Sequence, residues 1–274
     1  GVRKESGKRL WTFDVRNDGT GSLLDGLKFW NSETARVSGG VSQGYDKIFV
    51  GTENGDVVAL NPETGELVWR VKVKGEVIAS PAAGEGYVLV NTSAGNLFAL
   101  HPDTGEQRWM HEQESALLSL RGTSEPVIAS GGVIFGSGAG KVSVLIADKG
   151  VMAWDAAIAV PKGATDLSRM VDVDATPIVV DGTVYAIAFN GELVALELRT
   201  GRVMWKREYA SFRDMVVEGN TIYLVDSVGK IFAIDRRNGL EQWAQLGLHK
   251  HFLTGPAVYK DYLAIGDVEV TCFG

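Results

Sequence analysis

Apolar residues along the chain alternate over short stretches that end at turns rich in glycine, proline, aspartate and threonine. The stretch Gly95–Trp109, GNLFALHPDTGEQRW, is the clearest example. Leu97 and Ala99 alternate with Phe98 and Leu100, and this period of two predicts a β-strand. The turn residues that follow end on a glycine, which accepts a positive φ, and a second short strand then ends on tryptophan. The stretch therefore predicts a β-hairpin.

The glycine and tryptophan of this hairpin recur along the chain with the spacing G-x-x-x-W. The spacing occurs six times, at Gly7/Trp11, Gly65/Trp69, Gly105/Trp109, Gly150/Trp154, Gly201/Trp205 and Gly239/Trp243. A preceding strand of the form G-x-Φ-x-[AV]-[LI] recurs five times, at 55–60, 95–100, 140–145, 191–196 and 229–234. Repetition at roughly 40 residues is typical of propellers, solenoids and arrays.

The repeats divide the chain into units with four expected strands each, called A to D in chain order. Complete units are expected at 37–73, 77–111, 125–160, 175–209 and 212–246, and partial units at 1–15 and 254–274. In the first complete unit the strands are expected near 37–43, 46–51, 56–60 and 67–73. We predict an all-β fold, a single β-propeller domain over residues 1–274 built from four-stranded antiparallel blades. The tryptophan near the end of strand D is expected to fill the space between adjacent blades.

Composition and charge limit the classes of function that the chain can have. Hydrophobic residues make up 45% of the chain, which is enough for a continuous core, and the net charge is −7. No run of Lys and Arg exceeds two residues, so a nucleic-acid partner is disfavoured. The single cysteine, Cys272, cannot form an intramolecular disulfide, and no apolar run has the length of a membrane span. Since Gly1 is not an initiator methionine, we expect a processed or cut N-terminus.

The connections between units suggest where a partner binds. In a four-stranded antiparallel blade, the B–C turn and the D–A connection to the next blade lie on one face, and the A–B and C–D turns lie on the other. The C–D turns are short and alike, whereas the D–A connections 16–36, 111–124 and 155–174 are long and 210–211 is nearly absent. Because long variable loops on a repeat scaffold concentrate on its binding face, the D–A face is the candidate site.

Two of these connections carry side chains suited to protein binding. Leu118, Leu120 and Arg121 combine apolar anchors with a guanidinium, and Asp172 and Asp174 place two carboxylates on one side of an extended chain. Apolar anchors flanked by charges are typical of protein interfaces. The alternative is that the leucines fill the core and that one of the aspartates caps a turn.

Motifs that would indicate an enzyme or a metal site are incomplete. Asp172 and Asp174 have no His, Ser or Cys in a recognisable catalytic arrangement, and His249-x-His251 has no third ligand nearby. The glycine-rich run 136–141 is followed by Val142 where a phosphate-binding loop needs Ser or Thr, so we interpret it as a B–C turn. No catalytic, cofactor or metal site is therefore predicted.

The repeat resembles that of pyrroloquinoline-quinone-dependent dehydrogenases and their non-enzymatic relatives. Over residues 5 to 267 the chain more closely resembles the BamB family, lipoproteins of the outer-membrane β-barrel assembly machinery, most clearly at 119–126, 171–182, 189–208 and 222–226. The resemblance implies an eight-bladed scaffold at the periplasmic face of the outer membrane, without enzymatic activity. Its partners would be BamA and unfolded outer-membrane proteins. BamA would be bound through Leu118, Leu120, Arg121, Asp172 and Asp174.

The chain departs from this family in two respects. The lipidated N-terminal cysteine is absent, so we expect the membrane anchor to belong to a precursor. About five complete blades are present against eight, which leaves either a shortened chain or a smaller ring in which the Trp11 strand pairs with residues 254–273. The alternative function is a quinoprotein dehydrogenase, which would hold a quinone and Ca²⁺ in its central funnel.

Overall fold

The computed structural model describes residues 1–3, 5–15, 36–113, 124–160, 171–189, 191–248, 252–267 and 272–273. Every regular element in these ranges is a β-strand, so the predicted all-β fold is confirmed. None of the described segments is a helix that could cross a membrane. The chain divides into two compact units, Gly1–Gln113 (unit 1) and Glu114–Gly274 (unit 2). The single-domain organisation stays a prediction.

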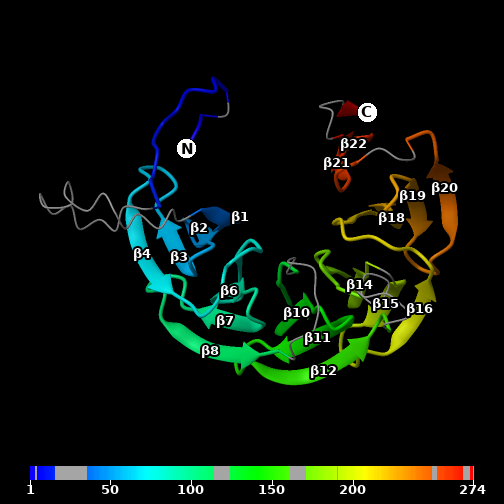
Figure 1. Cartoon of the computed structure of the whole chain (residues 1–274), viewed down its shortest axis with the longest axis horizontal. Helices are drawn as coiled ribbons and strands as arrows, with labels where there is room; N and C mark the ends of the chain where they lie inside the picture. Colours follow the sequence, from blue (N-terminus) through cyan, green and yellow to red (C-terminus); the bar gives the residue numbers. More distant parts are fainter. Residues whose placement is uncertain are drawn as a thin grey trace, which may run out of the picture. The chain divides into compact units, whose positions relative to one another are not determined.

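Each four-stranded sheet is an antiparallel meander whose strands lie in chain order (Figure 1). Unit 1 contains β1(Val37–Gly44), β2(Lys47–Thr52), β3(Asp56–Leu60) and β4(Leu67–Lys72), then β5(Ala82–Gly84), β6(Tyr87–Asn91), β7(Asn96–Leu100) and β8(Gln107–Glu112). Unit 2 begins with β9(Val127–Ala129), β10(Gly132–Gly136), β11(Lys141–Ile146) and β12(Val151–Ala157). It continues with β13(Ile178–Val180), β14(Thr183–Ile187), β15(Leu193–Glu197) and β16(Val203–Arg207), then β17(Val216–Glu218), β18(Thr221–Val225), β19(Ile231–Asp235) and β20(Glu241–Gln245). A three-stranded sheet follows, formed by β21(Ala257–Tyr259), β22(Tyr262–Gly266) and β23(Cys272–Phe273).

The C–D turns form as their residue types predict. In the turn after β3, the Asn61 side chain accepts hydrogen bonds from the backbone N–H groups of Glu63 and Thr64, at 2.8 and 3.1 Å. Gly65 closes this turn with φ +75° and donates its N–H to the Asn61 carbonyl at 2.9 Å. Local hydrogen bonding of this kind needs no tertiary support, which explains why the turns can be predicted from the sequence.

The tryptophan of strand D lies near the middle of that strand, as Trp109 does in β8, and not at the end of the strand as predicted. As predicted, it packs against the following sheet. Within each unit its indole Nε1 donates to a backbone carbonyl in the next C–D turn. The pairs are Trp11–Pro62 (2.9 Å), Trp69–Pro102 (2.8 Å), Trp154–Leu198 (2.8 Å) and Trp205–Arg236 (3.0 Å). Each ring thus joins two sheets through buried apolar area and one hydrogen bond.

In each of the five four-stranded sheets that the structure describes, the strand that carries the tryptophan contains a β-bulge that the sequence analysis did not anticipate. In β16, Trp205 pairs with Ala195 and Val203 with Leu196, so Met204 is an extra residue in the ladder. The same irregularity precedes the tryptophan in β4, β8, β12 and β20. A bulge increases the local twist and interrupts the outer edge, so these edge strands are poor templates for pairing with another chain.

The glycine of the C–D turn leaves room for the tryptophan ring. Gly201 has φ +71°, and a Cβ there would lie 2.6 Å from Trp154 Cε3. The substitution Gly201→Ala is therefore expected to cost about 2 kcal/mol, from left-handed backbone strain and from displacement of the ring. Urea unfolding followed by far-UV circular dichroism measures this loss.

Gly182 provides a matched control in the same sheet. Its φ is +73°, but a Cβ there would have no neighbour within 4 Å. The substitution Gly182→Ala should therefore cost only the backbone strain, about 1 kcal/mol. Equal losses in the two variants would show that ring packing does not restrict Gly201.

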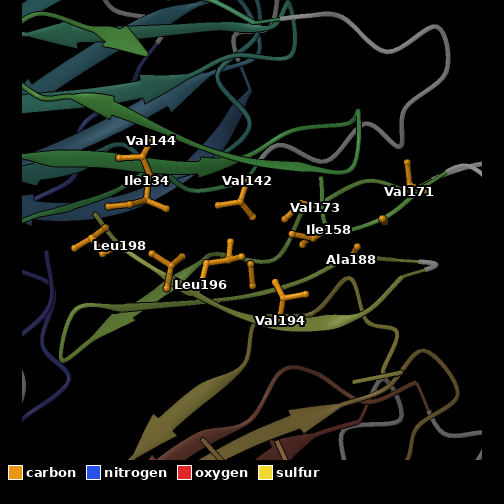
Figure 2. Close-up of a cluster of buried hydrophobic side chains, with 13 residues drawn as sticks. Ile134, Val142, Val144, Ile158, Val171, Val173, Ala188, Val194, Leu196 and Leu198 are labelled. Carbon is orange, nitrogen blue, oxygen red and sulfur yellow. The ribbon is translucent and has the colours of Figure 1, made fainter. Parts of the chain in front are cut away.

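The core between the third and fourth complete sheets extends to the segment that precedes β13. Ile134 and Val144 from β10 and β11 face Leu196 from β15 across the two sheets (Figure 2). Val171 and Val173 belong to the same buried cluster and lie at one end of it. The segment 171–174 is thus part of the packed core and not a separate surface loop.

Candidate functional site

The segment 171–174 lies on the B–C side of the sheets, the face that the sequence analysis selected. The Val173 N–H donates to the carbonyl of Ser137 in the turn between β10 and β11, at 3.1 Å. The carbonyl of Asp172 accepts the N–H of Phe189, which follows β14, at 2.9 Å. The segment is therefore fixed to the B–C turns of two successive sheets.

The glycine-rich run between β10 and β11 allows the segment to approach closely. The structure confirms that this run is a B–C turn, because β10 ends at Gly136 and β11 begins at Lys141. A Cβ on Gly136 would overlap the carbonyl oxygen of Val173. Gly140 similarly faces Val171, whose Cγ2 would lie 2.9 Å from a Cβ there. Glycine is required at Gly136 because the backbone and side chain of Val173 occupy the space. At Gly140 it is required because φ is +73° and a Cβ would meet the Ala159 carbonyl oxygen as well as the Val171 side chain.

The two candidate aspartates differ in their exposure. Val171 and Val173 point into the core, so alternation along the extended segment directs the aspartates the other way. Asp172 is fully buried, with 0% of its surface exposed, and Asp174 is partly exposed. Of the two side chains, only that of Asp174 reaches the surface.

The environment of Asp174 favours its neutral form. Burial raises the pKa of its carboxyl from 3.8 to about 7, and the negative charge of Asp172 adds to this effect. The interaction also shows that the structure brings these two predicted residues together. A positive charge close to Asp174 would favour release of this proton and the charged form of the carboxyl.

Two further carboxylates, Glu125 before β9 and Asp214 before β17, lie near the first strands of two sheets of unit 2, and the sequence analysis missed them. Burial raises the pKa of Glu125, and the charge of Asp214 raises it further. Asp214 also accepts a hydrogen bond through Oδ1 from the Thr176 N–H at 2.7 Å. These contacts link three sheets of unit 2, which explains why the repeat pattern within any one sheet gave no signal for them.

The other predicted partner-binding residues, Leu118, Leu120 and Arg121, lie outside the described residues, as do His249 and His251. Within the described ranges, no group of three or more His, Cys, Asp or Glu side chains is arranged to hold a metal ion.

Comparison with known proteins gives a consistent family assignment. The family profile described as "Outer membrane protein assembly factor BamB" matches residues 1–245. A curated protein of that name from Alteromonas naphthalenivorans is 45% identical over 267 residues, which cover 97% of this chain and 64% of the relative. The crystal structure of BamB from Moraxella catarrhalis superposes with a TM-score of 0.79 at 25% identity, over 87% of this chain and 76% of that chain.

A quinohemoprotein alcohol dehydrogenase from Comamonas testosteroni is also similar in fold. Its TM-score is 0.66 at 19% identity, over 77% of this chain and 43% of that chain. This likeness concerns the propeller fold alone. The curated relatives are longer than this chain, which spans 64–66% of the first two of them. From the profile match and the identities over nearly its whole length, the chain belongs to the BamB family of outer membrane protein assembly factors.

Proposed function

We propose that this protein is a non-enzymatic scaffold of the outer-membrane protein assembly complex and binds BamA through the B–C side of unit 2. The observation that carries the role is the match to BamB over residues 1–245, together with identities of 39–45% to proteins named as assembly factors. Such a scaffold would act at the periplasmic face of the outer membrane. It would be held there by a lipid anchor outside this chain, and unfolded outer-membrane proteins would be its further partners.

The geometry of the segment 171–174 supports the choice of this face. Its backbone is fixed to two B–C turns, and its valines are packed in the core, so little conformational freedom is lost when a partner binds. The partly exposed Asp174 would contact a cationic group of the partner. The buried Asp172 would act through Asp174, by setting its charge, and through the backbone of the segment.

Leu118, Leu120 and Arg121 complete the proposed interface. Leucines bury apolar area without a charge to desolvate, and an arginine can form a bidentate pair with a carboxylate of the partner. In most interfaces a few residues carry most of the binding energy, and arginine is enriched among them.

The double substitution Leu118→Ala with Arg121→Ala is expected to weaken binding of BamA about 100-fold, because both an anchor and a charged contact are removed. The purified chain and detergent-solubilised BamA would be mixed, and their dissociation constant measured by biolayer interferometry. Far-UV circular dichroism would verify that the variant is folded. Unchanged affinity of a folded double variant would contradict the assignment of these residues.

A matched variant tests whether the face itself matters. Arg202→Ala with Val203→Ala removes the same kinds of side chain from an exposed C–D turn and the start of β16. This variant should bind BamA as the unmodified chain does.

The quinoprotein alternative is tested separately by absorbance titration with pyrroloquinoline quinone and Ca²⁺. Tight stoichiometric binding of the quinone would overturn the scaffold proposal.

A further inference from the structure

An aromatic residue and an arginine lie together in the shortest connection between sheets of unit 2. Phe212 exposes 42% of its surface, and its ring centroid is 6.0 Å from that of Phe189. The guanidinium carbon of Arg213 lies 4.4 Å from the centroid of the Phe212 ring, a distance typical of a cation–π contact. We call Phe189, Phe212 and Arg213 together the Phe212–Arg213 patch.

The backbone beneath the patch is held rigidly. Ser211 is buried, and its Oγ donates to the Val225 carbonyl at 2.7 Å and accepts the Arg213 N–H at 2.9 Å. The Arg213 guanidinium also donates from Nη1 to the Asp226 carbonyl at 2.8 Å. An exposed ring and a guanidinium that are already ordered lose little entropy on binding, which is a property of binding hot spots.

The patch is continuous with the segment 171–174. Phe189 donates its N–H to Asp172, and Ser211 donates its N–H to the carbonyl of Ala188, at 2.9 and 3.3 Å. Farther along, Ser227 in the turn between β18 and β19 donates to Ala210 at 3.0 Å. The surface that includes Asp174 thus continues over the B–C side of the next sheet without leaving unit 2.

The charges along this surface define its partner. One end carries the partly exposed Asp174 carboxyl, and the other carries the Arg213 guanidinium against the exposed ring of Phe212. Partial burial lowers the pKa of Arg213, and the nearby Asp226 opposes this effect. A guanidinium partly removed from water is stabilised by a carboxylate more strongly than a fully solvated one.

We propose that the Phe212–Arg213 patch is a second contact for the same protein partner and takes a partner segment with an acidic side chain beside an apolar one. The charges of the segment would complement those of this surface, with its basic part at Asp174 and its acidic part at Arg213. The apolar side chain would cover the exposed face of Phe212. This inference rests on the proposed function, because it assigns the patch to the binding of BamA.

The test measures the affinity of detergent-solubilised BamA for single variants of the chain. Phe212→Ala and Arg213→Gln are each expected to raise the dissociation constant about 10-fold, and Arg213→Glu more than that. Glutamine can still donate a hydrogen bond at this position, so Arg213→Gln isolates the loss of charge. The effect of Arg213→Gln should shrink at high salt, whereas that of Phe212→Ala should not.

A similar aromatic–cation pair provides the control. Tyr259 is 67% exposed, and Lys260 Nζ lies 5.3 Å from its ring centroid, at an A–B turn of unit 2. Tyr259→Ala and Lys260→Gln should leave the affinity unchanged. If the unmodified chain binds BamA and the patch variants, folded by circular dichroism, bind equally well, the inference is wrong while the proposed function stands. If the unmodified chain does not bind BamA, both are overturned.

Discussion

Replacement of Trp205 by alanine is expected to lower the free energy of unfolding by about 3–5 kcal/mol, because it removes a large side chain that packs between two sheets and leaves a cavity there. The side chain is only 9% exposed, and its ring centroid is 6.1 Å from that of Tyr185. Its Nε1 is also the donor to the Arg236 carbonyl at 3.0 Å. The variant therefore loses apolar contacts and leaves a carbonyl without this donor. Urea unfolding followed by far-UV circular dichroism measures the loss without relying on tryptophan fluorescence.

Two further variants show how much of the lost free energy of unfolding comes from packing. One removes the hydrogen bond alone, and the other changes the same repeat position in a more exposed setting. Trp205→Phe keeps most of the apolar ring and removes the N–H, so its cost should be about 1–2 kcal/mol. Trp243 occupies the same position of the next sheet but is 45% exposed, so Trp243→Ala should cost at least about 2 kcal/mol less than Trp205→Ala. Similar losses for Trp205→Ala and Trp243→Ala would mean that packing between sheets is not the cause.

The fold could be predicted from the sequence because its repeated parts are local. Turns such as Asn61–Gly65 are formed by hydrogen bonds among neighbouring residues, so their residue types indicate the turn directly. Central strands such as β7, which is buried along its whole length, follow from short apolar runs bounded by such turns. The packing role of tryptophan could also be predicted, since a large aromatic residue at a fixed position of each repeat is expected to be buried against the neighbouring sheet.

The bulges could not be predicted, because they depend on pairing across strands. Nothing in the composition of β16 distinguishes Met204 from a regularly paired residue. The extra residue is visible only when Trp205 and Val203 are matched to their partners in β15. Cross-strand register is a tertiary property that periodicity within one strand does not contain.

The candidate site was predictable only in part, for a similar reason. Alternation placed Asp172 and Asp174 on one side of an extended segment, but their different burial depends on turns and strands distant in sequence. Phe212 and Arg213 gave no signal, because the sequence analysis looked for the site on the long D–A connections and the connection 210–211 is nearly absent. Their proposed role depends on the contact with Phe189, which reaches Phe212 from the B–C turn of the preceding sheet.

The burial of Asp174 makes stability depend on pH. In the folded chain its pKa is raised to about 7, whereas the ordinary value is 3.8. Between these values the folded state holds a proton that the unfolded chain releases, so the free energy of unfolding falls as the pH rises from about 4 to about 7. Below this window both states are protonated and no penalty is present. Above it, the folded state carries the full cost of a charged, partly buried carboxylate beside Asp172.

Asp174→Asn is therefore expected to leave stability nearly unchanged at pH 4 and to raise the free energy of unfolding by about 3 kcal/mol at pH 8, since asparagine has the same shape without the charge. Urea unfolding at both pH values, compared with the unmodified chain, gives the difference directly. The exposed Glu218 provides a matched control, and Glu218→Gln should alter stability by less than about 0.5 kcal/mol at either pH. A gain for Asp174→Asn of equal size at pH 4 and pH 8 would contradict a proton-linked effect and would indicate a change in packing instead.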